Sequence, residues 1–278
     1  MILIADSGST KTDWTVIKDD NTTFTIQTKG INPFFQSEEE IAAEIENNLL
    51  QHLPSSTFSG IYFYGAGCAF DKVEVVRKAI LVHLQSDDVQ VNSDMLAAAH
   101  ALCGKHSGIA CILGTGSNSC AYDGEKITAN VSPLGFILGD EGSGAVLGKL
   151  FIGSLLKNQL EPGLKEEFFE TYDLNPTKII NRVYRQAFPN RFLATFSPFI
   201  KKHINKPNVH RLVKNSFKEF FKRNVMQYNY KQESVHFIGS IAHHYEEVIR
   251  EVAQEEGIQM GKILKSPMEG LIEYHLTK

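Results

Sequence analysis

The chain has 278 residues, which at a typical domain size of about 150 residues gives room for roughly two lobes. It carries 28 Lys and Arg against 32 Asp and Glu, so its net charge of −4 lacks the basic excess typical of nucleic-acid-binding proteins. A hydrophobic fraction of 42% excludes disorder, and no apolar run approaches the ~18 residues of a membrane span. We therefore expect a folded, soluble chain without a nucleic-acid or membrane partner.

The N-terminus and the cysteines both indicate a cytoplasmic protein. The first apolar run ends at Asp6 after five residues and follows no positive charge, so it predicts a buried strand rather than a secretory signal. Cys68, Cys103, Cys111 and Cys120 form no C-x-x-C pair and lie in apolar or small-residue stretches. This is typical of reduced, buried thiols and argues against disulfides, zinc and iron–sulfur clusters.

The first hundred residues alternate β-prone runs with helical patterns, as α/β proteins do. The expected strands are residues 2–5, 13–17, 23–26, 60–64 and 89–91. The first three lie too close together for crossovers, which predicts an antiparallel meander. The expected helices are residues 37–49, 71–84 and 95–102. The first of these begins with a capping box formed by Ser37 and Glu40.

An internal repeat appears when residues 6–10 (DSGST) are placed over residues 114–118 (GTGSN). Each copy follows an apolar run and precedes another β-prone segment, so the repeat predicts two lobes built on one strand–turn–strand plan. Between residues 162 and 232 the composition changes to helices with charged faces, which predicts a helical insert. Its expected helices are residues 164–172, 176–187, 191–203 and 209–226.

After the insert the α/β pattern resumes. Strands are expected at residues 235–238 and 262–264, with a helix between them that starts near Gly239 and Ser240. A second capping box, Ser266 with Glu269, predicts a terminal helix.

The chemistry rests on the two Gly/Ser/Thr turns and on Asp94. No segment matches a Walker A loop, a dinucleotide-binding glycine motif or a serine hydrolase elbow. Turns of this kind aim consecutive backbone N–H groups into one concavity, which suits phosphate oxygens, although each turn alone also fits an ordinary hairpin. Asp94 follows a strand end, where open α/β sheets bind ligands. Its alternative role is the N-cap of the next helix.

Five blocks carry a family resemblance. They are Asp6–Thr12, Asp94 before an alanine-rich helix, Gly114–Asn118, Gly139–Ser143 and Ile238–Ser240. Together they resemble the sugar kinase/Hsp70/actin superfamily and, within it, the N-acetylglucosamine kinase-like group of the BadF/BadG/BcrA/BcrD ATPases. The blocks occur in the family's order and cover most of the chain apart from the insert.

The resemblance implies an α/β fold of two ribonuclease H-like lobes of the actin/hexokinase type, with a cleft between them. The first lobe would comprise residues 1–107 joined by the C-terminal helix 266–278. The second would comprise residues 108–265 with the insert at 162–232. The implied activity is ATP-dependent phosphorylation of an amino sugar, most simply N-acetylglucosamine at its 6-hydroxyl, with ATP and Mg²⁺ as cofactors.

The same resemblance implies a role for each matching position. Asp94 would be the catalytic base, since a carboxyl with an ordinary pKa of about 3.9 is ionised at neutral pH. Asp6 would hold Mg²⁺ through water. The implied ATP phosphate contacts are Ser7, Gly8, Ser9, Thr10, Gly114, Thr115, Gly116 and Ser117. The implied adenosine contacts are Gly239 and Ser240, and the implied sugar contacts are Asn32, Asp94, Asn118, Gly135 and Asp140.

Several alternatives stay open at this point. Asn32 precedes a proline and fits a routine turn, and Asp140 could charge the first turn of a helix. Residues 133–135 (PLG) depart from the family's Gly-Trp-Gly-type segment near the acetamido group, so glucosamine or another cell-wall sugar is an alternative substrate.

Two other functions and the oligomeric state also stay open. A BadF-type activating ATPase is disfavoured by the cysteine placement, and a sugar-responsive regulator by the lack of a basic recognition helix. The spacing leaves the oligomeric state open, with a homodimer as one option.

Overall fold

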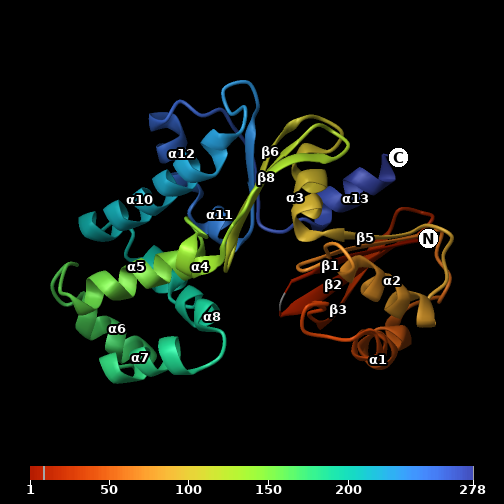
Figure 1. Ribbon diagram of the computed structural model, residues 1–278, viewed down its shortest axis with the longest axis horizontal. Coiled ribbons are helices and arrows are strands. Elements are labelled where there is room, and N and C mark those ends of the chain that lie inside the picture. The colour runs from red at the N-terminus through yellow and green to blue at the C-terminus, as the bar shows by residue number, and fades with distance from the viewer. Residues whose placement is uncertain (9, 278) are drawn as a thin grey trace. The chain divides into compact units, whose positions relative to one another are not determined.

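The computed structural model describes residues 1–8 and 10–277 (Figure 1), so Ser9, one of the expected phosphate contacts, lies outside the described residues. The chain divides into two compact units, Met1–Gly104 with Pro267–Lys278, and Lys105–Ser266. Each unit combines a mixed sheet with helices, which confirms the expected α/β fold class. In the described part of the chain, no helix is both long and apolar enough to cross a membrane.

The first unit is built on a mixed sheet. Its described strands are β1 (Ile2–Ser7), β2 (Lys11–Ile17), β3 (Thr23–Lys29), β4 (Gly60–Gly65) and β5 (Val89–Ser93), in the order β3-β2-β1-β4-β5. Strands β1 to β3 pair antiparallel, as the sequence predicts, whereas β4 and β5 run parallel to β1. The carboxyl ends of β1, β4 and β5 therefore meet at one edge of the sheet, the edge at which parallel sheets bind ligands.

The helices of the first unit are α1 (Glu38–Asn48), α2 (Lys72–His83), α3 (Asp94–Cys103) and α13 (Met268–Leu276), with a 3₁₀ turn at Leu50–His52. The capping box is confirmed, because Glu40 N–H donates to Ser37 Oγ at 3.3 Å and Ser37 N–H donates to Glu40 Oε2 at 2.8 Å. Helix α13 packs on α3, where a Cβ on Gly270 would lie 2.4 Å from the carbonyl oxygen of Ala101. A glycine is needed for this close approach.

The second capping box is wrong. The N-cap of α13 is Pro267, and no side-chain hydrogen bond caps this helix. The helix begins at Met268 and its N-cap position falls on Pro267, so Ser266 lies one residue before the cap position.

The second unit repeats the plan of the first. Its described strands are β6 (Gly108–Leu113), β7 (Ser117–Tyr122), β8 (Ile127–Val131), β9 (Val235–Ile238) and β10 (Met260–Leu264), in the order β10-β9-β6-β7-β8. Strands β6 to β8 form an antiparallel meander, and β9 and β10 run parallel to β6. The internal repeat is therefore confirmed, and it extends over the whole sheet rather than over one turn.

The helices of the second unit begin around the second glycine motif and continue into the insert. They are α4 (Gly135–Leu138), α5 (Gly144–Leu156), α6 (Leu164–Tyr172), α7 (Pro176–Arg185), α8 (Pro189–Ala194), α9 (Ser197–Lys202), α10 (Pro207–Arg223), α11 (Ser240–His244) and α12 (Glu246–Glu255), with a 3₁₀ turn at Val225–Gln227. The helix expected at 191–203 is wrong, because α8 ends at Ala194 and α9 starts anew with Pro198 in its first turn. Proline has no N–H for a hydrogen bond to the preceding turn, so it favours a new helix start.

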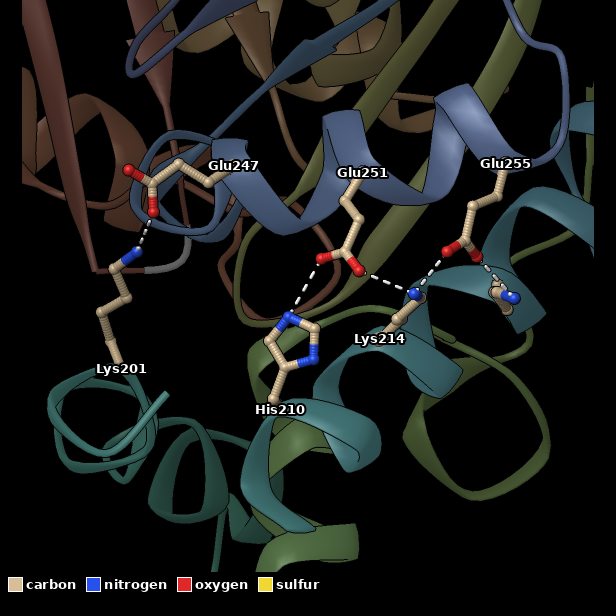
Figure 2. Close-up of polar contacts among 7 residues, drawn as sticks. Lys201, His210, Lys214, Glu247, Glu251 and Glu255 are labelled. Carbon is tan, nitrogen blue, oxygen red and sulfur yellow. Dashed lines mark hydrogen bonds and ion pairs between the residues drawn. The ribbon is translucent and has the colours of Figure 1, made fainter. Parts of the chain in front are cut away.

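A ladder of ion pairs joins the insert to α12 (Figure 2). Three acidic residues spaced four apart on α12 face basic residues at similar spacing on α9 and α10. The pairs are Lys201–Glu247 (3.6 Å), His210–Glu251 (2.9 Å), Lys214–Glu251 (2.6 Å), Lys214–Glu255 (2.5 Å) and Lys218–Glu255 (2.8 Å). Lys214 and Lys218 lower the pKa of Glu255 to about 2. The ladder flanks an apolar core that the insert shares with the sheet.

Candidate functional site

Asp94 is the first residue of α3 and is not its cap. The N-cap is Ser93, whose Oγ accepts the Leu96 N–H at 3.2 Å. The alternative role of Asp94 as the N-cap of α3 is therefore wrong, because Ser93 occupies the cap position. Burial raises the pKa of the Asp94 carboxyl, while the backbone N–H groups of Asp94 and Met95 lower it. The site thus holds a partly buried carboxylate whose ionised form is supported by helix N–H donors.

Asp6 lies among like charges near the end of β1. Asp13 is its direct neighbour on β2, and Asp94 is a second carboxylate that acts on it. Burial, followed by the charges of Asp13 and Asp94, raises the pKa of Asp6 to about 7, against a smaller lowering by Lys11. Asp13 itself accepts hydrogen bonds from Lys11 Nζ at 2.7 Å and Gln27 Nε2 at 2.8 Å. Asp6 is therefore the carboxylate of this group that most needs a cation.

This environment fits a magnesium ion held mainly by a nucleotide. Among the described residues, no group of three His, Cys, Asp or Glu side chains could hold a metal without help. In phosphotransferases, Mg²⁺ usually takes one or two carboxylates and completes its shell with phosphate oxygens and water. A divalent cation also relieves the repulsion that Asp6 experiences from Asp13 and Asp94.

The first glycine turn connects β1 to β2. Ser7 is buried, and its Oγ lies 2.7 Å from Thr12 Oγ1, donates to Ile31 O at 3.0 Å and accepts the Ile31 N–H at 2.9 Å. The Ser7 hydroxyl therefore anchors the loop after β3. Gly8 and Thr10 are exposed, so in the described part of the turn these two residues can be reached by a ligand.

Asn32 lies on the anchored loop. Its Oδ1 accepts the Phe34 N–H at 3.0 Å, and its own N–H donates to Gln36 Oε1 at 2.7 Å. The turn alternative is thus confirmed. The turn engages only Oδ1 of the Asn32 side chain, because within the described residues Nδ2 of Asn32 makes no hydrogen bond. One donor of Asn32 stays available to a ligand, and its sugar contact stays a prediction.

The turn after β4 holds none of the expected site residues, yet it contacts the first glycine turn. Ala66 N–H donates to Ser7 O at 3.0 Å, and Cys68 lies close enough to Asp94 for that carboxylate to contribute to raising the pKa of its thiol to about 12. The larger cause of this shift is burial. The turn thus contacts the segment of Ser7 and lies within the electrostatic range of Asp94. Two glycines directly after a predicted parallel strand were the signal that could have indicated it.

In the second unit, the Gly114–Ser117 turn packs on the start of α5. Gly114 N–H donates to Gly116 O at 2.9 Å, which closes the turn. The turn carbonyls of Gly114 and Thr115 accept the N–H groups of Gly144 (2.8 Å) and Ala145 (3.1 Å). These donors of α5 are occupied, so a phosphate at this site would depend on the backbone N–H groups of the turn itself.

Asp140 braces the same turn. It is buried, has a left-handed φ of +56°, and its carboxylate accepts the Ser117 N–H. Burial raises the pKa of Asp140 to about 6, and this backbone donor opposes the rise. The helix-charge alternative is wrong, because α5 begins at Gly144 with Ser143 as its N-cap. Asp140 therefore lies beside the turn rather than in a helix.

Three further expected contacts surround this region. Gly239 has a φ of +118°, and a Cβ there would lie 2.3 Å from Leu113 O, directly before the turn. Ser240, the other expected adenosine contact, is exposed as the first residue of α11. Asn118 Oδ1 accepts Asn130 Nδ2 at 2.9 Å, so this side chain lies toward β8. The structure thus brings Gly239, Asp140 and the turn together.

Gly135 lies apart in the sequence from that turn. It begins the short helix α4 with a φ of +72°, and its carbonyl accepts the Gly139 N–H at 2.8 Å. Asp140 N–H donates to Pro133 O at 2.9 Å, which connects this helix to the braced turn through the backbone. The sugar contacts expected of Gly135 and Asn118 stay predictions.

Comparison with solved structures agrees with this geometry. The chain is similar to the putative N-acetylglucosamine kinase of Porphyromonas gingivalis, with 53% identity and a TM-score of 0.95 over 100% of this chain and 99% of that chain. The putative N-acetylglucosamine kinase of Chromobacterium violaceum shares 16% identity and a TM-score of 0.74 over 98% of both chains. MreB 5 of Spiroplasma citri, bound to AMPPNP, shares 8% identity and a TM-score of 0.56 over 99% of this chain and 96% of that chain. No protein-family model and no curated protein matches the chain.

The two units repeat one strand order, and the two more distant structures show that this fold is shared. The identity of 53% over the full length goes further. The chain belongs to the family of N-acetylglucosamine kinase-like proteins, as the sequence resemblance implied.

Proposed function

We propose that the protein is an ATP-dependent kinase that phosphorylates an amino sugar, with N-acetylglucosamine as the acceptor and its 6-hydroxyl as the reacting group. The observation that carries this proposal is the group formed by Asp94, Asp6 and Asn32 with the glycine turns of the first unit. The similarity to the Porphyromonas gingivalis protein supports the substrate class.

The residues of the first unit supply a base and an oriented donor. Asp94 would accept the proton of the sugar hydroxyl as its oxygen attacks the γ-phosphate, and its raised pKa strengthens it as a base. The N–H groups of Met95 and Asp94 keep its ionised form accessible. Asn32 would donate Nδ2 to a second sugar hydroxyl while its Oδ1 stays bound to the loop.

The nucleotide would be held by backbone groups and by Asp6. In the first unit the phosphates would lie against the exposed Gly8 and Thr10, although the Gly8 N–H donates to Lys11 O. In the second unit the N–H groups of Thr115 and Gly116 would serve phosphate oxygens, since those of Gly114 and Ser117 are taken by Gly116 O and Asp140. Asp6 would hold Mg²⁺ through water, and this ion neutralises charge on the phosphates when bound. Gly239 and Ser240 would lie along the adenosine.

A panel of sugars assayed for ADP release tests the proposal. N-acetylglucosamine, glucosamine, N-acetylmannosamine, glucose and no sugar would be compared at saturating Mg²⁺ and ATP. We expect N-acetylglucosamine to stimulate ADP release most strongly. Preference for glucosamine would indicate that residues 133–135, which depart from the family's pattern, do not select for the N-acetyl group. ATP turnover that no sugar stimulates would contradict the kinase and favour an activating ATPase.

The substitution Asn32→Asp tests whether Asn32 contacts the sugar or only stabilises the turn. The new carboxylate can still accept the Phe34 N–H, so the loop keeps its hydrogen bond, but it has no N–H to donate to a sugar. We expect kcat/KM for the sugar to fall about 10- to 100-fold, the scale of a lost buried hydrogen bond, with an unchanged KM for ATP. A variant with full sugar kinetics would restrict Asn32 to the turn.

Gly116→Val tests the phosphate role of the second turn. A Cβ at Gly116 would lie 3.0 Å from Asp140 Oδ2, so a branched side chain displaces either the bracing carboxylate or the turn. We expect the dissociation constant for ATP to rise about 10-fold or more. Gly153→Val is the matched control, because apart from the chain neighbours and the backbone of its own helix no described heavy atom lies within 4 Å of a Cβ at Gly153. Equal ATP affinity of the two variants would remove the turn from the nucleotide site.

A further inference from the structure

The turn Gly65–Cys68 contacts two segments of the first unit that the proposed function uses. Ala66 N–H donates to the carbonyl of Ser7, at the start of the first glycine turn. Gly67 lies against Asn32. In the same turn, the charge of Asp94 contributes to the raised pKa of the Cys68 thiol. A single backbone turn therefore joins the nucleotide segment to the sugar-binding candidate.

The contact at Gly67 leaves no room for a side chain. Gly67 has a φ of +82°, and a Cβ built there would lie 2.5 Å from Asn32 Oδ1, 3.2 Å from Asn32 Cγ and 2.7 Å from Phe34 Cδ2. Contacts under 3.0 Å essentially never occur for real Cβ atoms. A side chain at position 67 would therefore move the Asn32 amide, the Phe34 ring or the turn itself.

The Asn32 amide cannot move away from a Cβ at position 67 without losing its orientation. Its Oδ1, the atom nearest to the Cβ position, accepts the Phe34 N–H at 3.0 Å, and this bond fixes which end of the amide faces the loop. The Asn32 N–H is bound to Gln36 Oε1 at 2.7 Å, so the backbone is held as well. The direction of the Nδ2 donor thus depends on the space above Gly67.

We propose that Gly67 is a positioning residue for the sugar acceptor. It acts through Asn32, whose Nδ2 it keeps aimed at a hydroxyl oxygen of the sugar. The absence of a Cβ at position 67 is therefore a requirement for acceptor binding and not for nucleotide binding. This inference rests on the proposed function, because it assigns a further determinant to the same acceptor site.

Gly67→Ala and Gly104→Ala form a matched pair that tests the inference. Both glycines belong to the first unit and have positive φ, +82° and +62°, so alanine strains the backbone at either position. Apart from its chain neighbours, no described heavy atom lies within 4 Å of a Cβ at Gly104. We expect Gly67→Ala to raise the KM for the sugar about 10-fold or more, with the KM for ATP changed less than about twofold, and Gly104→Ala to alter neither.

A double-mutant cycle with Asn32→Ala shows whether Gly67 acts through Asn32. We expect Gly67→Ala to have little further effect on the KM for the sugar once Asn32 is alanine. The cycle is also followed by thermal unfolding midpoints, so it gives an answer even where a variant is inactive. We expect Gly67→Ala to lower the unfolding midpoint more than Gly104→Ala does. This difference in midpoint should be smaller when Asn32 is also replaced by alanine.

The outcomes separate the two proposals. If the unsubstituted chain transfers phosphate to a sugar and Gly67→Ala behaves like Gly104→Ala, the positioning role is wrong and the kinase stands. Additive effects of Gly67→Ala and Asn32→Ala would equally overturn it. If the unsubstituted chain transfers phosphate to no sugar, the proposed function fails, and the positioning role fails with it.

Discussion

Asp94→Asn is expected to lower the turnover of sugar phosphorylation by about 10²- to 10⁴-fold, the usual contribution of a positioned base. The amide has the shape of the carboxyl but cannot accept the proton of the attacking hydroxyl. Folding should be preserved, because Ser93 and not Asp94 caps α3. The affinity for ATP should also be preserved, since the residue acts on the acceptor side of the reaction.

Asp71→Asn is the matched control for this substitution. Asp71 likewise lies at the start of a helix of the first unit, as the N-cap of α2, but it is exposed and its side chain makes no capping hydrogen bond. Steady-state ADP release, ATP titration and the thermal unfolding midpoint would be measured for both variants. Full turnover by Asp94→Asn would contradict its role as the base, whereas equal loss in both variants would indicate a general effect of the substitution.

Asp6→Asn is expected to stabilise the metal-free protein at pH 8 and to abolish Mg²⁺-dependent phosphate transfer. The native pKa of Asp6, about 7, lies above the ordinary value of 3.8, so the folded protein holds a proton that the unfolded chain has already lost. The stability of the parent chain therefore falls as pH rises from about 4 to 7. A shift of this size corresponds to an upper value of roughly 4 kcal/mol at pH 8.

The difference between the parent chain and Asp6→Asn should therefore shrink as pH is lowered toward 4, where Asp6 is protonated in the folded state and approaches half protonation in the unfolded chain. Denaturant unfolding at pH 8, 6 and 4.5 without Mg²⁺ measures it. Asp87→Asn, at an exposed position of the same unit, is the control and should show no such trend. Equal stability of Asp6→Asn and the parent chain at pH 8 would show that Asp6 carries no unfavourable buried charge.

Much of the fold could be predicted because local signals agree with it. The short spacing of the first three apolar runs predicts the meander, and the Ser37–Glu40 box marks the start of α1 correctly. The likeness of residues 6–10 and 114–118 indicates a duplicated plan, which the shared strand order confirms. These features depend on residues that are neighbours in sequence, where turn geometry and helix capping are decisive.

The errors arise where two residues compete for one role. Ser93 and Asp94 are both good N-caps, and only the backbone angles show that Ser93 takes the position. Ser266 loses the cap of α13 to Pro267 because the helix begins at Met268, one residue later than the capping-box spacing implies. Helix ends shift by a residue at little cost, so a pattern does not fix them.

The candidate site was only partly predictable for a different reason. Asp6, Asp94 and the glycine turns have recognisable neighbours in sequence. The role of Gly67 depends on contacts with Asn32 and Phe34, which lie more than thirty residues earlier in the chain. The bracing of Ser117 by Asp140 is likewise a contact between distant segments. Tertiary contacts of this kind leave no periodic signal in a sequence.

The central claim is that the chain transfers the γ-phosphate of ATP to the 6-hydroxyl of an amino sugar. Phosphorus NMR of a reaction containing the protein, Mg²⁺, ATP and N-acetylglucosamine tests it most directly, because it resolves ADP, inorganic phosphate and a sugar phosphate in one sample. We expect a sugar 6-phosphate to appear in equal amount to ADP, and neither product to accumulate at a comparable rate with Asp94→Asn. Release of ADP with inorganic phosphate alone, or no turnover with any sugar, would contradict the claim.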